Sequence, residues 1–334
     1  MRVARLHGPQ DLRLTDEPMP DVPAGWTRIR VSAVGLCGSD LHWYSEGEIG
    51  DARLTSPLVV GHEFAGIIDA GPRAGEPVAI DPAIPCDTCP TCRTGHRHLC
   101  PSVRFAGHGT NDGALREYMS WPTDLLHPLP APLSGVDGAM LEPLGVAVHA
   151  IDLGHVRLGA SVAVVGCGPI GLLLLQAVRA AGATTVVAVE PLAHRREAAL
   201  RLGADAALSP EEAAESEWAT SPVAAVDVAF EVAGTDAAVE TSMALVRPGG
   251  RVVLVGIPDG DLTSFPAGLA RRKGLTIALS RRMAEVYPRA TALVTQGLVD
   301  VASVVTATYP LEEAPAAFDS AAARVGLKTV VEMP

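Results

Sequence analysis

The sequence predicts an α/β protein of two domains, one rich in short strands and one built on an open, doubly wound parallel sheet. Three observations lead to this prediction. The chain has 334 residues, more than one small core needs. Short apolar or alternating runs bounded by glycine and proline fill residues 1–145. Buried strands then alternate with helical stretches over residues 146–282.

In the first part, the strand candidates are "TRIRVSAVGLC", "HEFAGIIDAG" and "GEPVAIDP". They predict an irregular β-barrel or sandwich with long loops. In the second part, "SVAVVGCGPIGLLLLQAVRAAGATTVVAVEP" reads as a buried strand, a glycine turn, an apolar helix and a second buried strand. Further strands are expected at "VDVAFEVAG", "GGRVVLVG" and "GLTIALS". Residues 283–334 are expected to form two helical stretches around a strand, with "LKTVVEMP" as a final strand.

Composition limits the partners of this chain. Hydrophobic residues make up 48% of it, which allows a sizeable core, and the net charge of −12 disfavours nucleic acid or an anionic membrane. The N-terminus lacks an apolar segment of signal-peptide length, and the longest apolar run, "GPIGLLLLQAV", is too short to span a bilayer. We therefore expect a cytoplasmic protein with reduced thiols. We also expect a small-molecule substrate and a homodimer or homotetramer.

A short loop, "PCDTCPTCRTGHRHLC", contains four of the six cysteines. Four thiolates at this spacing suit a tetrahedral Zn²⁺ with no open position, so we predict a structural zinc. A redox pair and an iron–sulfur cluster are the alternatives. The predicted ligands are Cys86, Cys89, Cys92 and Cys100.

A glycine-rich turn follows the strand "SVAVV" and opens a helix. This context turns a weak motif into a prediction of a dinucleotide site, with the pyrophosphate at the helix N-terminus. The predicted cofactor-binding loop comprises Gly166, Gly168, Pro169, Ile170 and Gly171.

The residue that ends the second strand bears on the choice of nucleotide. Glu190 lies 19 residues after Gly171, where a carboxylate binds the ribose hydroxyls and repels a 2′-phosphate. NAD is therefore favoured over NADP. Arg195 and Arg196 weaken this preference, although at least one of them is expected on a solvated helix face.

A second set of metal-type residues is spread over three stretches, "GLCGSDLHWYSEGEIGD", "VVGHEFAG" and "AMLEPLGVAVHA". Each residue alone has an ordinary structural explanation, such as a buried thiol or a hydrogen-bonded core histidine. Taken together they form a mixed sulfur, nitrogen and oxygen donor set. The candidates are Cys37, His42, His62, Glu63 and Glu142.

These stretches, with the four-cysteine loop, "VVGCGPIG" and the tail "LEEAPAAFDSA", occur in an order that resembles the zinc-dependent medium-chain dehydrogenase/reductase family. Within it, the chain is similar to the polyol branch of sorbitol, xylitol and L-idonate dehydrogenases. The resemblance implies a GroES-like catalytic domain formed by residues 1–145 and 283–334, with a Rossmann domain, residues 146–282, inserted between them.

The resemblance also implies roles for individual residues. It places a catalytic zinc on Cys37, His62 and Glu63, and it matches Glu142 to a carboxylate that ligates this zinc or holds its water. Ser39 matches the hydroxyl that relays the substrate proton, and His42 a group that continues the relay toward solvent. Asp40 matches the partner of the zinc-bound histidine.

The implied chemistry agrees with the donor sets. Alcohol oxidation removes a proton from oxygen and a hydride from carbon. A zinc ion with three protein ligands keeps a position open for the alcohol and lowers the alcohol's pKa, and NAD accepts the hydride. We expect two zinc ions per chain, NAD in preference to NADP, and an oxidoreductase that acts on alcohols.

The substrate is less well specified. Trp43 and Tyr44 stand in the reverse of the order usual in the polyol branch, and Arg282 maps to a distal arginine of that branch, with Arg281 one residue away. We expect Trp43, Glu142 and Arg282 to face the substrate, whereas Glu46 is as readily a solvated loop carboxylate.

The sequence leaves three hypotheses about function. The first is a dehydrogenase of polyols or sugar acids, and the second is a threonine, butanediol or cyclitol dehydrogenase of the same fold. The third, a non-catalytic zinc- and nucleotide-binding protein, does not need an open metal site. That site also disfavours a zinc-free quinone reductase.

Overall fold

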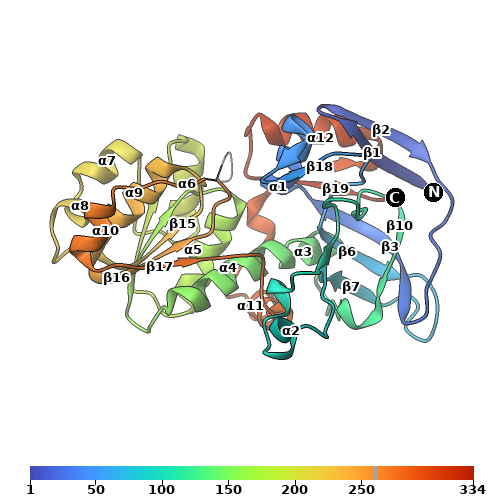
Figure 1. The fold of residues 1–334 in the computed structure, drawn as a ribbon, viewed down its shortest axis with the longest axis horizontal. Helices are drawn as coiled ribbons and strands as arrows, with labels where there is room; N and C mark the ends of the chain where they lie inside the picture. Colours follow the sequence, from blue (N-terminus) through green and yellow to red (C-terminus); the bar gives the residue numbers. More distant parts are fainter. Residues whose placement is uncertain (259–261) are drawn as a thin grey trace. The chain divides into compact units, whose positions relative to one another are not determined.

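A computed structural model describes residues 1–258 and 262–334 (Figure 1). The chain divides into two compact units. Unit 1 holds Met1–Glu142, Tyr287–Thr295 and Val301–Pro334, and unit 2 holds Pro143–Val286 and Gln296–Asp300. The boundaries expected from the sequence, after residues 145 and 282, fall near these divisions. Both ends of the chain contribute to unit 1.

Unit 1 is built on a seven-stranded sheet in which distant segments are neighbours. The strand order is β11-β7-β6-β3-β19-β18, with β10 also paired to β3. β19 runs antiparallel to β3 and parallel to β18, so the last strand of the chain completes the sheet. The strands are β3 (Trp26–Gly35), β6 (Glu63–Ile68), β7 (Pro77–Ile80), β10 (Tyr118–Pro122), β11 (Leu126–Pro128), β18 (Val305–Pro310) and β19 (Lys328–Glu332).

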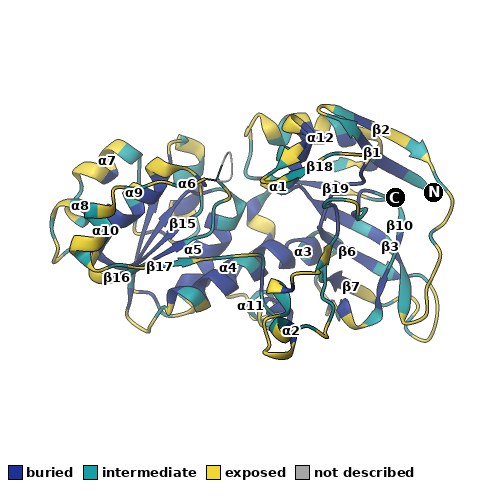
Figure 2. Ribbon diagram, viewed as in Figure 1, coloured by how far each residue is buried: buried dark blue, intermediate teal, exposed yellow. Residues whose placement is uncertain are grey.

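Smaller elements complete unit 1. They are β1 (Arg2–Gly8), β2 (Asp11–Asp16), β4 (Glu48–Ile49), β5 (Ala52–Arg53), β8 (Ala83–Ile84), β9 (Arg104–Phe105), α1 (Gly38–Glu46), α2 (Pro90–Arg93), α3 (Gly135–Ala139), α11 (Tyr287–Thr295) and α12 (Ala314–Ala322). In the main sheet, β6, β7 and β19 are largely buried, whereas β18 is not (Figure 2). Aliphatic and aromatic side chains from β3, β6 and β10 form the core, among them Ile29, Phe64 and Trp121.

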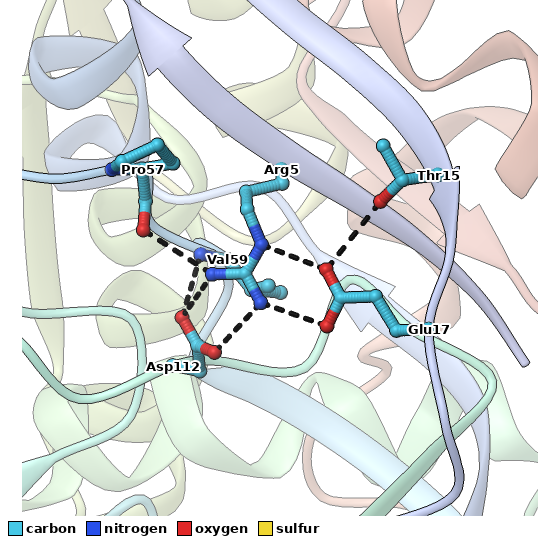
Figure 3. Close-up of polar contacts among 6 residues, drawn as sticks. All are labelled: Arg5, Thr15, Glu17, Pro57, Val59 and Asp112. Atoms are coloured by element: carbon cyan, nitrogen blue, oxygen red, sulfur yellow. Dashed lines mark hydrogen bonds and ion pairs between the residues drawn. The ribbon is translucent and has the colours of Figure 1, made fainter.

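Arg5 of β1 links the β1–β2 hairpin to neighbouring segments through a network of polar contacts (Figure 3). The Arg5 guanidinium pairs with both Glu17 and Asp112, at 2.8 and 2.9 Å, and donates to the Pro57 carbonyl at 3.2 Å. Asp112 in turn accepts the Val59 amide at 3.0 Å. This network holds the segment that leads into the "VVGHEF" stretch.

Unit 2 has a six-stranded, all-parallel sheet in the order β14-β13-β12-β15-β16-β17. Its strands are β12 (Ser161–Val165), β13 (Thr185–Val189), β14 (Ala206–Leu208), β15 (Val226–Glu231), β16 (Val246–Leu254) and β17 (Thr276–Leu279). Its helices are α4 (Leu141–Gly154, which begins in unit 1), α5 (Pro169–Ala180), α6 (Ala193–Arg201), α7 (Pro210–Glu215), α8 (Glu217–Thr220), α9 (Asp236–Leu245) and α10 (Ala267–Lys273). Among the described residues, every helix is too short or too polar to cross a membrane.

The strand–turn–helix at the start of unit 2 follows from its residues. β12 is a continuous apolar run and is largely buried. Strands of a parallel sheet need such a sequence because both faces of the sheet are covered. Gly166 has φ 102°, and a Cβ there would lie 2.9 Å from the Ala233 nitrogen, so only glycine allows this turn. Pro169 opens α5, where its missing N–H costs nothing. The sequence-predicted parallel α/β sheet is confirmed.

Candidate active site and metal centres

Cys37 lies at the N-terminal end of α1, two residues after β3 ends at Gly35. Its backbone N–H donates to Asp40 Oδ2 at 3.0 Å, which closes the first turn of the helix. Asp40 is fully buried, and its other oxygen accepts the Gly61 amide at 3.1 Å and lies 3.3 Å from His62 Nδ1. One carboxylate therefore connects the cysteine segment to the histidine segment.

His62 and Glu63 occupy the entrance to β6. Gly61 has φ 96°, and a Cβ on it would lie 2.8 Å from Val34 Cγ1, so this tight approach requires glycine. His62 is 6% exposed and Glu63 is 1% exposed. The Phe105 ring lies 5.2 Å from the His62 ring.

The structure brings three of the predicted zinc ligands together. The candidate ligand atoms of Cys37, His62 and Glu63 all lie within 4.8 Å of one another. Burial opposes a charged His62, but Asp40 and Cys37 raise its pKa well above the ordinary value. Burial also opposes a charged Asp40, but His62 and two backbone amides lower its pKa. Asp40 thus stays ionised and orients the imidazole.

Glu142 lies in the first turn of α4 and belongs to the same electrostatic environment, although it is not part of the three-residue group. It is 4% exposed. Burial, with a further contribution from Glu63, raises the pKa of Glu142 to about 8. Whether it ligates a metal or holds water stays a prediction.

The four cysteines of the loop also come together. Cys86, Cys89, Cys92 and Cys100 each offer a sulfur within 4.8 Å of the others. Pro90 opens the one-turn helix α2, and Gly95, at φ 85°, lets the chain turn back toward Cys100. None of the four is in a disulfide, so all four sulfurs are available as ligands.

Unit 2 places Glu190 directly under the glycine-rich turn. Its two carboxylate oxygens accept the Cys167 amide at 2.8 Å and the Leu192 amide at 3.1 Å. A Cβ on Gly168 would lie 3.8 Å from Arg195 Nη1, so this guanidinium borders the turn. Arg196 instead donates to the carbonyls of Glu190 and Pro191 and caps the strand end.

Comparison with known proteins agrees with this geometry. A zinc-binding dehydrogenase model matches residues 169–296, and an alcohol dehydrogenase GroES-like domain model matches residues 23–131. A Bacillus subtilis (strain 168) sorbitol dehydrogenase is 33% identical over 96% of this chain and 93% of its own length. The chain belongs to the zinc-binding medium-chain dehydrogenases.

Solved structures support the same family. L-idonate 5-dehydrogenase from Escherichia coli K-12 MG1655 has a TM-score of 0.93 and 28% identity, covering 99% of this dehydrogenase and 97% of that chain. A zinc-binding dehydrogenase from Sinorhizobium meliloti 1021, bound to NADP, has a TM-score of 0.90 and 31% identity, covering 99% and 98%. The predicted GroES-like and Rossmann fold is confirmed.

The donor set of the dehydrogenase fits a zinc ion. A thiol, an imidazole and a carboxylate converge in a buried site, which is the mixture that catalytic zinc takes. Glu63 Oε1 is buried and, within the part of the chain that the structure describes, has no hydrogen-bond partner. A buried carboxylate oxygen without a partner is costly, and a metal would satisfy it.

The other predicted residues surround this dehydrogenase site in different ways. Ser39 follows Cys37 in the first turn of α1 and is half-buried. His42 lies one turn further along α1, with Nδ1 3.2 Å from Glu46 Oε1, which leads toward the exposed surface. Their relay roles stay predictions.

Trp43 and Arg282 were expected to contact the substrate. Trp43 is 1% exposed and packs in the core of unit 1, with its ring 5.6 Å from that of His108. This packing accounts for Trp43 by itself. Arg282 belongs to unit 2 and adopts φ 57°. Substrate contacts by Trp43 and Arg282 stay predictions.

Sequence reasoning missed one residue of the site. Lys328 is 3% exposed at the start of β19, where it forms an ion pair with Glu63 and donates to the Leu36 carbonyl at 2.8 Å. The available signal was a lone lysine in the apolar final strand "LKTVVEM". A charged residue there must be paired if the strand is buried.

Proposed function

We propose that this dehydrogenase oxidises a secondary alcohol of a polyol or sugar acid and transfers the hydride to NAD. The observation that carries the proposal is the group formed by the half-buried Cys37 thiol, the buried His62 imidazole and the buried Glu63 carboxylate, in a chain that also holds a glycine-rich turn. Zinc, when bound there, supplies Lewis acidity that lowers the pKa of the substrate hydroxyl. The sorbitol and L-idonate dehydrogenases among its relatives favour the substrate class.

The protein's part in the reaction is to move a proton and to orient the ligands. Ser39 accepts the hydroxyl proton of the substrate through a hydrogen bond as it gives up its own hydroxyl proton to the relay, so the serine stays neutral. His42, paired with Glu46 near the surface, passes it toward solvent. Asp40 holds His62 in the orientation in which its other ring nitrogen is a ligand. Glu142, protonated around neutral pH before a metal binds, supplies a further carboxyl beside the site.

NAD is proposed as the preferred cofactor because Glu190 places a buried carboxyl group beneath the turn. When ionised, that group repels a 2′-phosphate. The Arg195 guanidinium at the same turn would instead attract a 2′-phosphate. The kcat/KM with NAD⁺ should exceed that with NADP⁺, and Glu190→Ser should narrow the difference. Equal values in the unaltered enzyme would contradict this assignment.

The substrate proposal is tested with a panel of polyols, sugar acids, cyclitols, butanediol and threonine, with NADH formation followed by absorbance. We expect the highest kcat/KM for a polyol or a sugar acid. Cys37→Ala should abolish turnover and remove one of two zinc ions. A preference for threonine, butanediol or a cyclitol would replace the proposed substrate class, and full zinc content in Cys37→Ala would reject the metal site.

We also propose a homodimer or homotetramer located in the cytoplasm. β17 is the last strand of the parallel sheet, and its Leu279 side chain is 77% exposed. An edge strand with an exposed apolar side chain favours pairing with another copy. Light scattering coupled to size-exclusion chromatography would measure the mass, and a monomer at micromolar concentration would reject the assembly.

A further inference from the structure

A buried lysine lies next to the proposed catalytic metal ligands. Lys328, at 3% exposure, has its ammonium in contact with Glu63 Oε2, and it donates to the Leu36 carbonyl at 2.8 Å. Leu36 immediately precedes Cys37. One side chain from the end of the chain thus touches the carboxylate ligand and the backbone that carries the thiol ligand.

The absence of a side chain at Gly35 allows this contact. Gly35 ends β3, where it is paired with Glu63 of β6 on one side and with Val330 of β19 on the other. A Cβ on Gly35 would collide with Glu63 Oε2 and would lie 3.0 Å from Lys328 Cε. The bare backbone at Gly35 lets the Glu63–Lys328 pair occupy the space beside it.

The two oxygens of Glu63 have different surroundings. Both are buried without a hydrogen-bond partner among residues 1–258 and 262–334, but Oε2 forms the ion pair with Lys328. A carboxylate held by one oxygen presents the other in a defined direction. A Glu63 oxygen lies within 4.8 Å of the Cys37 sulfur and of a His62 nitrogen, and the ion pair of Oε2 with Lys328 leaves Oε1 for a metal.

Formal charges also favour a role for Lys328 at the metal site. A thiolate at Cys37 and carboxylates at Asp40 and Glu63 carry three negative charges. A zinc ion and Lys328 carry three positive charges, and His62 as a ligand is neutral. Buried charges are tolerated when they are paired, and Lys328 supplies the compensation that the metal alone does not.

We propose that Lys328 is a positioning residue for the catalytic metal: it holds Glu63 and the Leu36 carbonyl so that the carboxylate and thiol ligands are set before the metal binds. The inference rests on the proposed metal site at Cys37, His62 and Glu63. Lys328 does not itself ligate the metal, because an ammonium has no lone pair to offer. Partners of metal ligands typically account for 10- to 100-fold in metal affinity.

The test compares zinc affinity in the full-length protein and in Lys328→Met, measured by competition with a chromophoric chelator. In Lys328→Met, we expect the site of Cys37, His62 and Glu63 to lose about 10- to 100-fold in zinc affinity, while the zinc affinity of the four-cysteine site is unchanged. Replacing zinc by Co²⁺ adds a direct view of the ligand field. The visible absorption bands of cobalt in the Cys37 site should shift or weaken in the variant.

Lys273→Met is the matched control. Lys273 is a partly buried lysine of unit 2 whose ammonium donates to the carbonyls of Met243, Ala244 and Val246 at 2.6 to 3.0 Å. Its loss should lower thermal stability and leave both zinc affinity and the cobalt spectrum unchanged. A metal effect seen in Lys328→Met and absent in Lys273→Met is therefore not a result of general destabilisation.

If Lys328→Met does not give folded protein, Gly35→Ala provides a second test. It keeps every charge and forces Glu63 and Lys328 apart, so zinc affinity should again fall and the cobalt bands should change. Unchanged or tighter zinc binding with an unaltered cobalt spectrum, in whichever variant folds, would overturn the inference. Cys37→Ala separates the two proposals, because two retained zinc ions there would reject the metal site itself.

Discussion

Asp40 shows how much of the site depends on single side chains. It joins the Cys37 amide, the Gly61 amide and the His62 ring, and it is fully buried. Three contacts on one carboxylate bring ligands from two separate stretches of sequence together. The residues that would act on the substrate proton, Ser39 and His42, lie on the helix that begins at Cys37.

Ser39→Ala tests the proton path. The change should lower kcat by about 10²- to 10⁴-fold, the usual contribution of a positioned proton-transfer group. Zinc content should stay full because Ser39 is not a ligand. Ser39→Thr, which keeps the hydroxyl, should retain most of the activity. Normal turnover by Ser39→Ala, or loss of zinc from it, would show that the hydroxyl is a structural residue of the turn.

Cys167 provides a pH prediction away from the metal sites. Burial, with a contribution from Glu190, raises the pKa of Cys167 to about 12. At pH 8 its thiolate fraction should be on the order of 10³-fold below that of a free cysteine, so iodoacetamide should not label it in the folded protein. The unfolded thiol ionises first as pH rises, so this residue's contribution to stability is fully present below about pH 8.5 and is lost progressively as pH rises toward 12.

Peptide mass spectrometry of alkylated protein would measure this reactivity. Cys167 should become labelled only after unfolding in urea, which serves as the control. Labelling of Cys167 in the folded protein, at a rate close to that in urea, would contradict the burial that the structure shows.

At the scale of elements, the β1–β2 hairpin depends on an ion network at one of its faces. Arg5 and Arg13 are opposite each other in the hairpin register, yet their surroundings differ. The Arg5 side chain is 18% exposed and contacts Glu17 and Asp112, whereas Arg13 pairs with Asp11 at the surface. The two arginines form a matched pair for an experiment.

Arg5→Met should destabilise unit 1 by roughly 1–3 kcal/mol, because it leaves two partly buried carboxylates without their partner. Urea unfolding followed by tryptophan fluorescence would measure the shift in midpoint. Arg13→Met should leave the midpoint unchanged, since exposed ion pairs contribute little. Equal shifts for the two variants would mean that the network in Figure 3 does not hold the hairpin.

Local sequence patterns predicted some elements and missed others for physical reasons. β12, α5 and β13 were predictable because each has its own apolar pattern and a glycine marks the turn between β12 and α5. α1 was not, since its nine residues mix polar and aromatic side chains with little helical periodicity. Its N-terminus is determined by the Cys37–Asp40 contact, which local periodicity does not reveal.

At the scale of the molecule, the two metal sites have different consequences. Zinc bound by all four cysteines of the loop, as we predict, would form a closed site that contributes to folding, whereas zinc in the Cys37 site should contribute to chemistry. Metal analysis should find two zinc ions per chain. Cys92→Ser should reduce the yield of folded protein and lower its thermal stability. A folded, fully stable Cys92→Ser protein with one zinc would show that the loop does not need its metal.

Long-range pairing set the limit of what the sequence could predict about the site. Cys37, His62 and Glu63 could be proposed from family motifs, and the structure places them together. Lys328 could not, because it meets Leu36 across 292 residues and has no motif of its own. The packing of Trp43 against His108 was likewise invisible, because it depends on a loop distant in sequence.

The position of β19 between β3 and β18 has a consequence for synthesis on the ribosome. The first 142 residues emerge while the edge of β3 that β19 will occupy is still open and Glu63 still lacks Lys328. Nearly all of unit 2 is then translated as one continuous stretch, able to collapse at once. The sheet of unit 1 must therefore wait, with an unpaired edge on β3, until β19 has left the exit tunnel.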